Sequence, residues 1–191
     1  MRIISGSLKG RKLGFISQKD VKPLTDRIKE SLFQIIHGYV PDSSVLDLYA
    51  GCGSFGIEAL SRGAERAVFV DNDPDALRCI RNNLSRTGLE KRSTVRDTDV
   101  FSGIRTEGRE NSMFRVVFFD PPFANAENGT FFSEFNKHAG SVQTVLENNG
   151  LLIVRIPTSV KGSFAPAFLT LLRKKKYGRS TLLFFAKCSL S

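Results

Sequence analysis

The chain has 191 residues, 41% of them hydrophobic and 25% charged, which is typical of an ordinary folded protein and excludes a disordered chain. This length accommodates one domain with a sizeable core, or one domain with a small extension. Apolar runs are too short to span a membrane, Met1 is not followed by a signal-peptide core, and Cys52, Cys79 and Cys188 lie far apart. We therefore predict a cytoplasmic protein with reduced thiols, no membrane association, no disulfide framework and no metal site.

Positive charge is the informative bulk property, with a net charge of +9 and a pI of about 9.7. Cations gather in residues 1–29 and in "RKKKYGR" at 173–179, on either side of a less basic middle. A solvated basic face is the simpler interpretation, but this distribution favours a surface that contacts phosphates. The candidate phosphate-binding residues are Arg2, Lys9, Arg11, Lys12, Lys22, Arg27, Lys174, Lys175 and Arg179.

The first elements along the chain are two short β-prone segments, 1–6 and 10–15, which predict a small N-terminal β-hairpin. Residues 25–38 follow as an amphipathic helix capped by Thr25 or Asp26. Buried strands and helices then alternate. The predicted strands are 43–51, 66–71, 93–97, 114–120 and 150–156, and the predicted helices are 55–63, 73–88 and a helix after Asp99.

The tail, residues 168–188, is predicted to form two strands around a tight "YGRS" turn. Apolar strands that alternate with helices indicate a mostly parallel sheet covered on both faces, an open doubly wound α/β domain. The closing hairpin would add one antiparallel strand at an edge. We expect the α/β domain to span residues 25–191, preceded by a basic hairpin extension over residues 1–24.

Glycines and carboxylates follow the predicted strands at the edge where ligands bind in such sheets. "GCGSFG" at 51–56 matches G-x-G-x-x-G, which permits a tight turn and close backbone approach to a ligand. Asp71, 20 residues after Gly51, is suited to accept from both hydroxyls of a ribose. A plain strand-to-helix turn is the structural alternative. Otherwise the motif suits either a dinucleotide or S-adenosylmethionine (AdoMet).

Asp47 separates these two cofactors. It precedes Gly51 by four residues, where its charge would repel a pyrophosphate but suits the ammonium of a methionine moiety. The pattern therefore favours AdoMet. Asp99 is placed to accept from an adenine amino group, with Asp97 as the near alternative and helix capping as another role for Asp99. The predicted cofactor-binding residues are Asp47, Ala50, Gly51, Gly53, Asp71, Asn72, Asp99 and Val100.

"DPPF" at 120–123 follows the apolar run "FRVVFF". Pro121 and Pro122 fix the backbone and remove its donors, so Asp120 and the neighbouring carbonyls can present acceptors in one direction. An exocyclic amine on a nucleobase supplies matching N–H donors, and Phe123 can lie against the ring with a contact worth about 1–3 kcal/mol. These four residues are therefore the predicted catalytic set.

The chain resembles the bacterial 16S ribosomal RNA guanine-N2 methyltransferase RsmD family over almost its whole length. The resemblance is carried by "RIISGSLKGRKL", "KPLTDRIKESLF", "VLDLYAGCGSFGIEALSRGA", "VFVDNDPDAL", "DPPF" and "KKYGRSTLLFF". It implies a seven-stranded, Rossmann-like AdoMet-dependent fold, with the N-terminal hairpin binding RNA. It also implies methyl transfer to the N2 amine of a guanine in 16S ribosomal RNA or in the assembling small subunit.

Carried over by position, "TDR" at 25–27 lies near the cofactor and the RNA entrance. Three residues depart from the family's usual pattern, namely Leu24, Arg155 and Arg179. These departures affect the expected RNA contacts rather than the residues expected to carry out methyl transfer. We also expect a monomer, because no apolar interface stripe is left over.

Three other functions compete with this interpretation. A DNA or RNA methyltransferase acting on N6 of adenine or N4 of cytosine would use the same kind of clamp, but normally carries a separate recognition region. A non-catalytic RNA-binding module would explain the charge but not the acids at the strand ends. An NAD-dependent oxidoreductase would explain "GCGSFG" but leave "DPPF" without a role.

Overall fold

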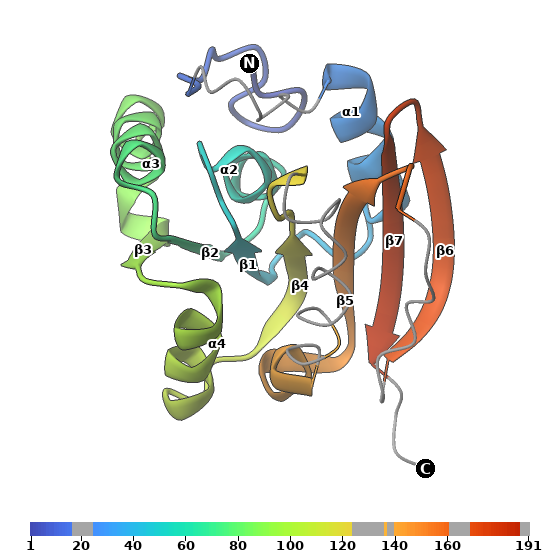
Figure 1. Ribbon diagram of the computed structural model, residues 1–191. Helices are drawn as coiled ribbons and strands as arrows, with labels where there is room; N and C mark the ends of the chain where they lie inside the picture. The colour runs from blue at the N-terminus through green and yellow to red at the C-terminus, as the bar shows by residue number, and fades with distance from the viewer. Residues whose placement is uncertain (17–24, 124–135, 137–139, 161–168, 188–191) are drawn as a thin grey trace.

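The structure is a computed structural model that describes residues 1–16, 25–123, 136, 140–160 and 169–187. It forms a single twisted sheet with helices on both faces (Figure 1). In chain order the elements are α1 (Asp26–Ile35), β1 (Ser44–Leu48), α2 (Ser54–Ser61), β2 (Arg66–Asp71), α3 (Pro74–Thr87), η1 (Glu90–Arg92), β3 (Ser93–Asp97), α4 (Val100–Arg109), β4 (Phe114–Phe119), β5 (Leu146–Pro157), β6 (Leu169–Tyr177) and β7 (Ser180–Lys187). Helix length and hydropathy in the described ranges fall short of what a bilayer crossing requires.

The sheet has seven strands in the order β3-β2-β1-β4-β5-β7-β6. Strands β1 to β5 pair in parallel, and β7 pairs antiparallel with both β5 and β6. The predicted fold class is confirmed, but the expected edge position of the antiparallel strand is wrong. Strand β7 lies inside the sheet because residues 180–185 are buried, whereas residues 170–176 of β6 are exposed and tolerate the edge.

Two apolar clusters lie on opposite faces of the sheet, since successive strand residues point to opposite sides. Val45, Phe118 and Ile153 face the cluster that contains residues of α1, α2 and α3. Leu46 and Val117 face the cluster that contains residues of α4 and of the helical segment 141–145. We call the first side the α1–α3 face.

The helix ends follow the signals expected from the sequence. The Ile28 N–H donates to the Thr25 side chain at the start of α1, which selects Thr25 over Asp26 as the cap. Asp73 caps α3 ahead of Pro74, and Gly88 closes the same helix with φ +71°.

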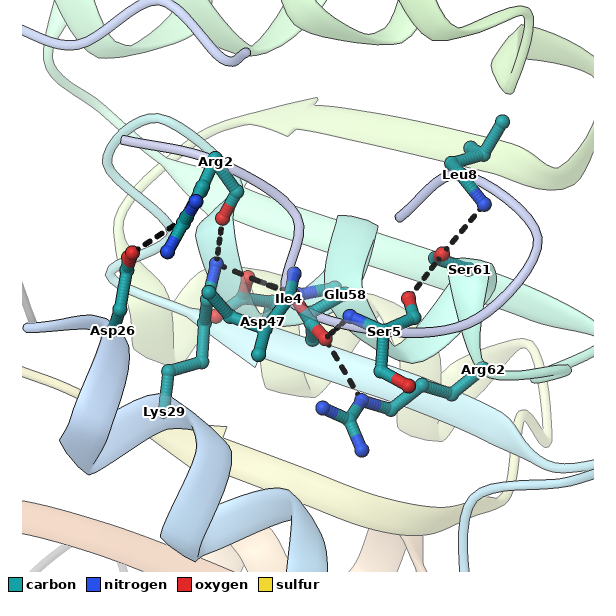
Figure 2. Close-up of polar contacts among 11 residues, drawn as sticks. Arg2, Ile4, Ser5, Leu8, Asp26, Lys29, Asp47, Glu58, Ser61 and Arg62 are labelled. Carbon is teal, nitrogen blue, oxygen red and sulfur yellow. Dashed lines mark hydrogen bonds and ion pairs between the residues drawn. The ribbon is translucent and has the colours of Figure 1, made fainter. Parts of the chain in front are cut away.

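The N-terminal segment, residues 1–16, forms one antiparallel bridge between Arg2 and Lys12 instead of the two continuous strands expected from the sequence. Its backbone bonds to α2 as well as to itself. The N–H groups of Ile4 and Ser5 donate to the two carboxylate oxygens of Glu58 at 2.8 and 3.0 Å. Ser61 extends these contacts to the following turn (Figure 2).

Glu58 lies at the centre of this contact, fully buried, with Lys29 Nζ at 3.3 Å and Arg62 Nε at 2.8 Å. Lys29 also donates to the carbonyl of Arg2. Burial lowers the pKa of Lys29, and the charge of Glu58 opposes that shift. The network therefore fixes the basic N-terminal segment to α1 and α2, while Ile3 and Leu13 enter the core.

Gly56, the last glycine of the 51–56 motif, gives a test of the close approach between α2 and β2. A methyl group there would lie 2.3 Å from the buried ring of Phe69, so Gly56→Ala should lower the free energy of unfolding by about 1–3 kcal/mol. Urea denaturation measures this change. Gly108→Ala is the matched helical control, because its methyl meets its nearest neighbour at 3.6 Å and alanine favours a helix. Equal stability of the two variants would contradict the packing argument.

Candidate functional site

Three carboxylates and one guanidinium lie along one edge of the sheet because of its register. Asp47 of β1 is level with Phe69 of β2 and Phe118 of β4. Asp71 lies two residues after Phe69, and Asp120 lies two residues after Phe118. Both side chains are therefore on the same face of the sheet as Asp47. Phe118 is in turn level with Ile153 of β5, so Arg155 follows on that face as well. All four charged residues are thus at the carboxyl edge of the α1–α3 face.

The glycine loop joins β1 to α2 through positive φ values at Tyr49, Gly51 and Gly53 (57°, 56° and 75°). Asp71 fixes this loop, because its Oδ2 accepts from the Gly51 N–H at 2.8 Å. The other oxygen accepts from the Asp73 N–H at 3.0 Å. Tyr49 is strained for a non-glycine residue, which is typical of functional sites. Asp71, the predicted ribose-binding acid, therefore fixes the glycine loop to the end of β2.

Asp47 lies beneath the loop and is 1% exposed. Its Oδ2 accepts from the Gly56 N–H at 2.9 Å, and within the described residues its Oδ1 is buried without a hydrogen-bond partner. Burial raises the pKa of Asp47 well above its usual value, and the charges of Asp120 and Asp71 raise it further. The site is therefore short of positive charge on this side and would be stabilised by a bound cation.

The expected adenine contacts lie at the neighbouring strand end. Asp97 is exposed and in register with Asp71, while Asp99 caps α4 by accepting from the Phe101 and Ser102 N–H groups. Bonds from Ser102 lower the pKa of Asp99. Capping does not exclude adenine binding, so the choice between these two acids stays a prediction.

The remaining three predicted cofactor residues fall into two environments. Asn72 is exposed beside Asp71, whereas Ala50 and Val100 are buried. Their contacts with a cofactor stay predictions.

Arg155 joins the acid and the aromatic residue of "DPPF". Its Nε donates to Asp120 Oδ1 at 2.5 Å, with both side chains 15% exposed or less. Its guanidinium carbon lies 4.7 Å from the centre of the Phe123 ring. In the sequence, Arg155 stands out only as a departure from the family pattern. The available signal was a charged residue inside the apolar run "GLLIVRI", because a buried charge requires a partner.

A cavity of about 520 Å³ opens beside this cluster. It brings together three segments that are distant in the sequence: the start of α1, the "DPPF" turn, and the hairpin turn between β6 and β7. Its lining residues are Thr25, Arg27, Ile28, Phe123, Arg155, Lys176, Tyr177, Gly178, Arg179 and Ser180. The predicted residues Arg27 and Arg179 therefore lie around Phe123.

The other predicted phosphate-binding residues are distributed over several surfaces. Lys175 lines an adjoining cavity of about 420 Å³, and Lys174 is exposed on the opposite face of β6. Of the N-terminal cations, Arg2 pairs with Asp26 at 2.7 Å and Arg11 donates to the Arg86 carbonyl. Lys9 and Lys12 are exposed. Lys22 lies outside the described residues. Phosphate binding by each of these residues stays a prediction.

The strand order, the glycine loop and the acid that ends β2 define the class of Rossmann-like methyltransferase folds. Residues 1–186 match the family described as "Conserved hypothetical protein 95", and the chain belongs to that family. This confirms the resemblance to the RsmD family.

Two curated relatives cover nearly the whole chain. "Putative rRNA methyltransferase YlbH" of Bacillus subtilis (strain 168) is 33% identical over 187 residues, covering 98% of this chain and 99% of the relative. "Ribosomal RNA small subunit methyltransferase D" of Haemophilus influenzae is 31% identical over 184 residues, covering 93% and 89%.

Solved structures agree in fold. "Putative methyltransferase yhhF from Escherichia coli" superposes with a TM-score of 0.81 at 27% identity, covering 98% of this chain and 97% of that one. An RNA methyltransferase from Salinibacter ruber in complex with S-adenosyl-L-homocysteine has a TM-score of 0.64 at 17% identity, covering 87% and 94%. The latter likeness shows the fold alone.

The buried carboxylate of Asp47 leads to a pH-dependence test. Its folded-state pKa lies above the unfolded value of about 3.9, so its ionisation removes stability as pH rises from 4 through the folded pKa. The Asp47→Asn variant has no ionisable group at this position, so its stability does not fall with pH for this reason. The free energy of unfolding of the variant minus that of the natural protein should therefore increase with pH, by about 1.4 kcal/mol per pH unit between the two pKa values. Urea titrations from pH 4 to 8 measure it, and a constant difference would contradict the assignment.

Proposed function

We propose that this protein transfers a methyl group from AdoMet to the exocyclic N2 amine of a guanine in small-subunit ribosomal RNA. The observation that carries the proposal is the placement of Asp120 and Phe123 between an acidic sheet edge and a basic cavity. An acidic edge suits a cationic cofactor, and a basic cavity suits RNA. The names of the curated relatives support ribosomal RNA as the substrate.

AdoMet fits the donor set at the carboxyl edge. Asp47, Asp71 and Asp120 lie there, and the positive charges of the methionine ammonium and sulfonium would favour the ionised form of the buried Asp47. In the proposed arrangement Asp47, Gly51 and Gly53 hold the methionine end, Asp71 the ribose and Asp99 or Asp97 the adenine. When bound, AdoMet supplies a methyl group on a good leaving group, so no metal or nucleophilic side chain is needed for the transfer.

The protein's part in the reaction is to hold the guanine amine. The lone pair of that amine is delocalised into the ring, which makes it a poor nucleophile. Asp120 and the backbone before Pro121 would accept its N–H bonds and localise the pair, while Phe123 packs on the base. Positioning of this kind lowers the barrier without a strong base, because the methylated amine releases its proton readily. The base must first leave its stack, which costs a few kcal/mol.

Arg155 has a positioning role in this proposal. Its ion pair sets the direction of the Asp120 carboxylate, and its guanidinium limits the movement of the Phe123 ring. Methylation of adenine N6 or cytosine N4 remains the alternative, because those amines offer the same N–H donors to Asp120. A monomeric state and a cytoplasmic location also remain predictions.

Mapping modified nucleosides tests the proposal directly. Small-subunit ribosomal RNA from cells lacking this protein, or subunits assembled from that RNA, should gain one N2-methylguanosine on incubation with protein and AdoMet. Asp120→Ala should lower the rate by about 10³-fold, because the amine loses its acceptor, while AdoMet binding by calorimetry stays nearly unchanged. Thermal unfolding shows whether the variant folds despite leaving Arg155 unpaired. Methyladenosine or methylcytosine as the product, or near-normal turnover of the variant, would overturn the assignment.

Two substitutions separate the contacts of Arg155. Arg155→Met keeps an apolar stem near Phe123 but removes the ion pair, so kcat should fall about 10²-fold through misplacement of Asp120. Arg155→Lys keeps the charge but not the planar contact with the ring, and should lose less. Steady-state kinetics with ribosomal RNA, together with AdoMet affinity, measures both. Unchanged kcat in Arg155→Met would show that the ion pair does not position the acid.

A further inference from the structure

A second cavity, of about 420 Å³, lies between α1 and the edge strand β6. Arg27 lines both this cavity and the one beside Phe123, so the two adjoin at that residue. Figure 1 shows α1 beside the end of β6, where the chain turns into β7. We call the two adjoining cavities the α1–β6 groove.

The floor of the groove is fixed by a contact between its two walls. The Ser31 hydroxyl and the Tyr177 hydroxyl are 2.5 Å apart, joining the middle of α1 to the last residue of β6. Glu30, Gln34 and Ile35 continue the same side of α1, as expected for residues three and four apart on a helix. The groove therefore needs little ordering to receive a ligand.

Strand alternation divides the basic run of β6 between two surfaces. Arg173 and Lys175 pair with Phe184 and Leu182, whose side chains belong to the α1–α3 face. Lys174 pairs with Leu183, which belongs to the opposite face. The run is therefore not one uniform patch: Arg173, Lys175 and, next to the β6–β7 turn, Lys176 line the groove, and Lys174 does not.

Charge identifies the kind of ligand that the groove fits. Among the described residues, its lining includes six cations and one carboxylate, Glu30. The cations are Arg27, Arg155, Arg173, Lys175, Lys176 and Arg179. Two aromatic side chains, Phe123 and Tyr177, lie at the end beside the catalytic candidates. A basic groove with aromatic side chains is the arrangement that binds single-stranded nucleic acid.

We propose that the RNA strand next to the target nucleotide lies unpaired in the α1–β6 groove, with phosphates bound by Arg27, Arg173 and Lys175. This deepens the proposed function and rests on it. A base that enters the cavity beside Phe123 has left its stack, so the nucleotides adjoining it emerge where Arg27 connects the two cavities. The neighbouring phosphates would then follow α1 and β6 toward Arg173.

The test compares two double variants that each remove two positive charges. The groove variant, Arg173→Gln with Lys175→Gln, removes the two positive charges of β6 that are proposed to bind phosphates. Lys91→Gln with Arg109→Gln is the matched control, because both side chains are exposed, neither lines the groove and neither is a predicted phosphate contact. The probe is a fluorescein-labelled RNA of about twelve uridines with one central guanosine, and binding is followed by fluorescence anisotropy.

The groove variant should bind this RNA about tenfold more weakly than the natural protein, and its salt dependence should flatten by about 1.4 in log K against log salt. The control variant should stay close to the natural protein. Equal losses of RNA affinity in both variants would show that only the overall charge of the protein matters. Unchanged RNA affinity in both variants would exclude the groove as the RNA-binding surface. A blunt RNA duplex that competes as well as the single strand would also overturn the proposal.

This experiment is independent of the proposed reaction. Binding is measured without methyl transfer, so a wrong target base would leave the difference between the two variants intact. If the groove does not bind RNA, the result of the nucleoside mapping is in turn unaffected. AdoMet calorimetry and thermal unfolding verify that both variants are folded.

Discussion

The ion pair between Asp120 and Arg155 is the interaction on which the candidate site depends. It connects the ends of β4 and β5, and Arg155 also contacts the Phe123 ring. Asp120 and Asp71 both lie near enough to the buried Asp47 for their charges to act on it, and burial in a low dielectric strengthens these interactions. Without Arg155 this edge would hold three carboxylates with no ion pair among the described residues. The positive charge of Arg155 therefore offsets part of the negative charge of the acids at this edge, and the acids still outnumber it.

Opposite charges meet at the "DPPF" turn, and this explains how one small domain could serve a cation and a polyanion together. The acids lie on the ends of β1, β2 and β4, and the cations lie around α1 and the β6–β7 turn. The proposed methyl donor and the proposed RNA would each approach the side that attracts it. Asp120 and Phe123 stand where the two sides join.

The N-terminal segment shows how a buried polar network can locate a basic surface. Glu58 accepts from two backbone N–H groups, Lys29 and Arg62, and a carboxylate with these partners can be buried without an unsatisfied charge. Residues 1–16 are therefore packed on α1 and α2 (Figure 2). Among their cations, Arg2 pairs with Asp26 of "TDR", between Thr25 and Arg27, which line the cavity that the proposed RNA would enter. Whether residues 1–24 form a separate unit stays a prediction.

Features that depend on neighbours along the chain could be predicted from the sequence: the cap at Asp73, the glycine loop, the alternation of strands and helices, and hence the fold class. These signals are local, because propensity and capping act within a few residues. Three features required the tertiary structure: β7 lies inside the sheet, Arg155 pairs with Asp120, and Lys175 but not Lys174 lines the groove. Each of these follows from strand pairing and register, which join residues far apart in the chain and set the face on which a side chain lies.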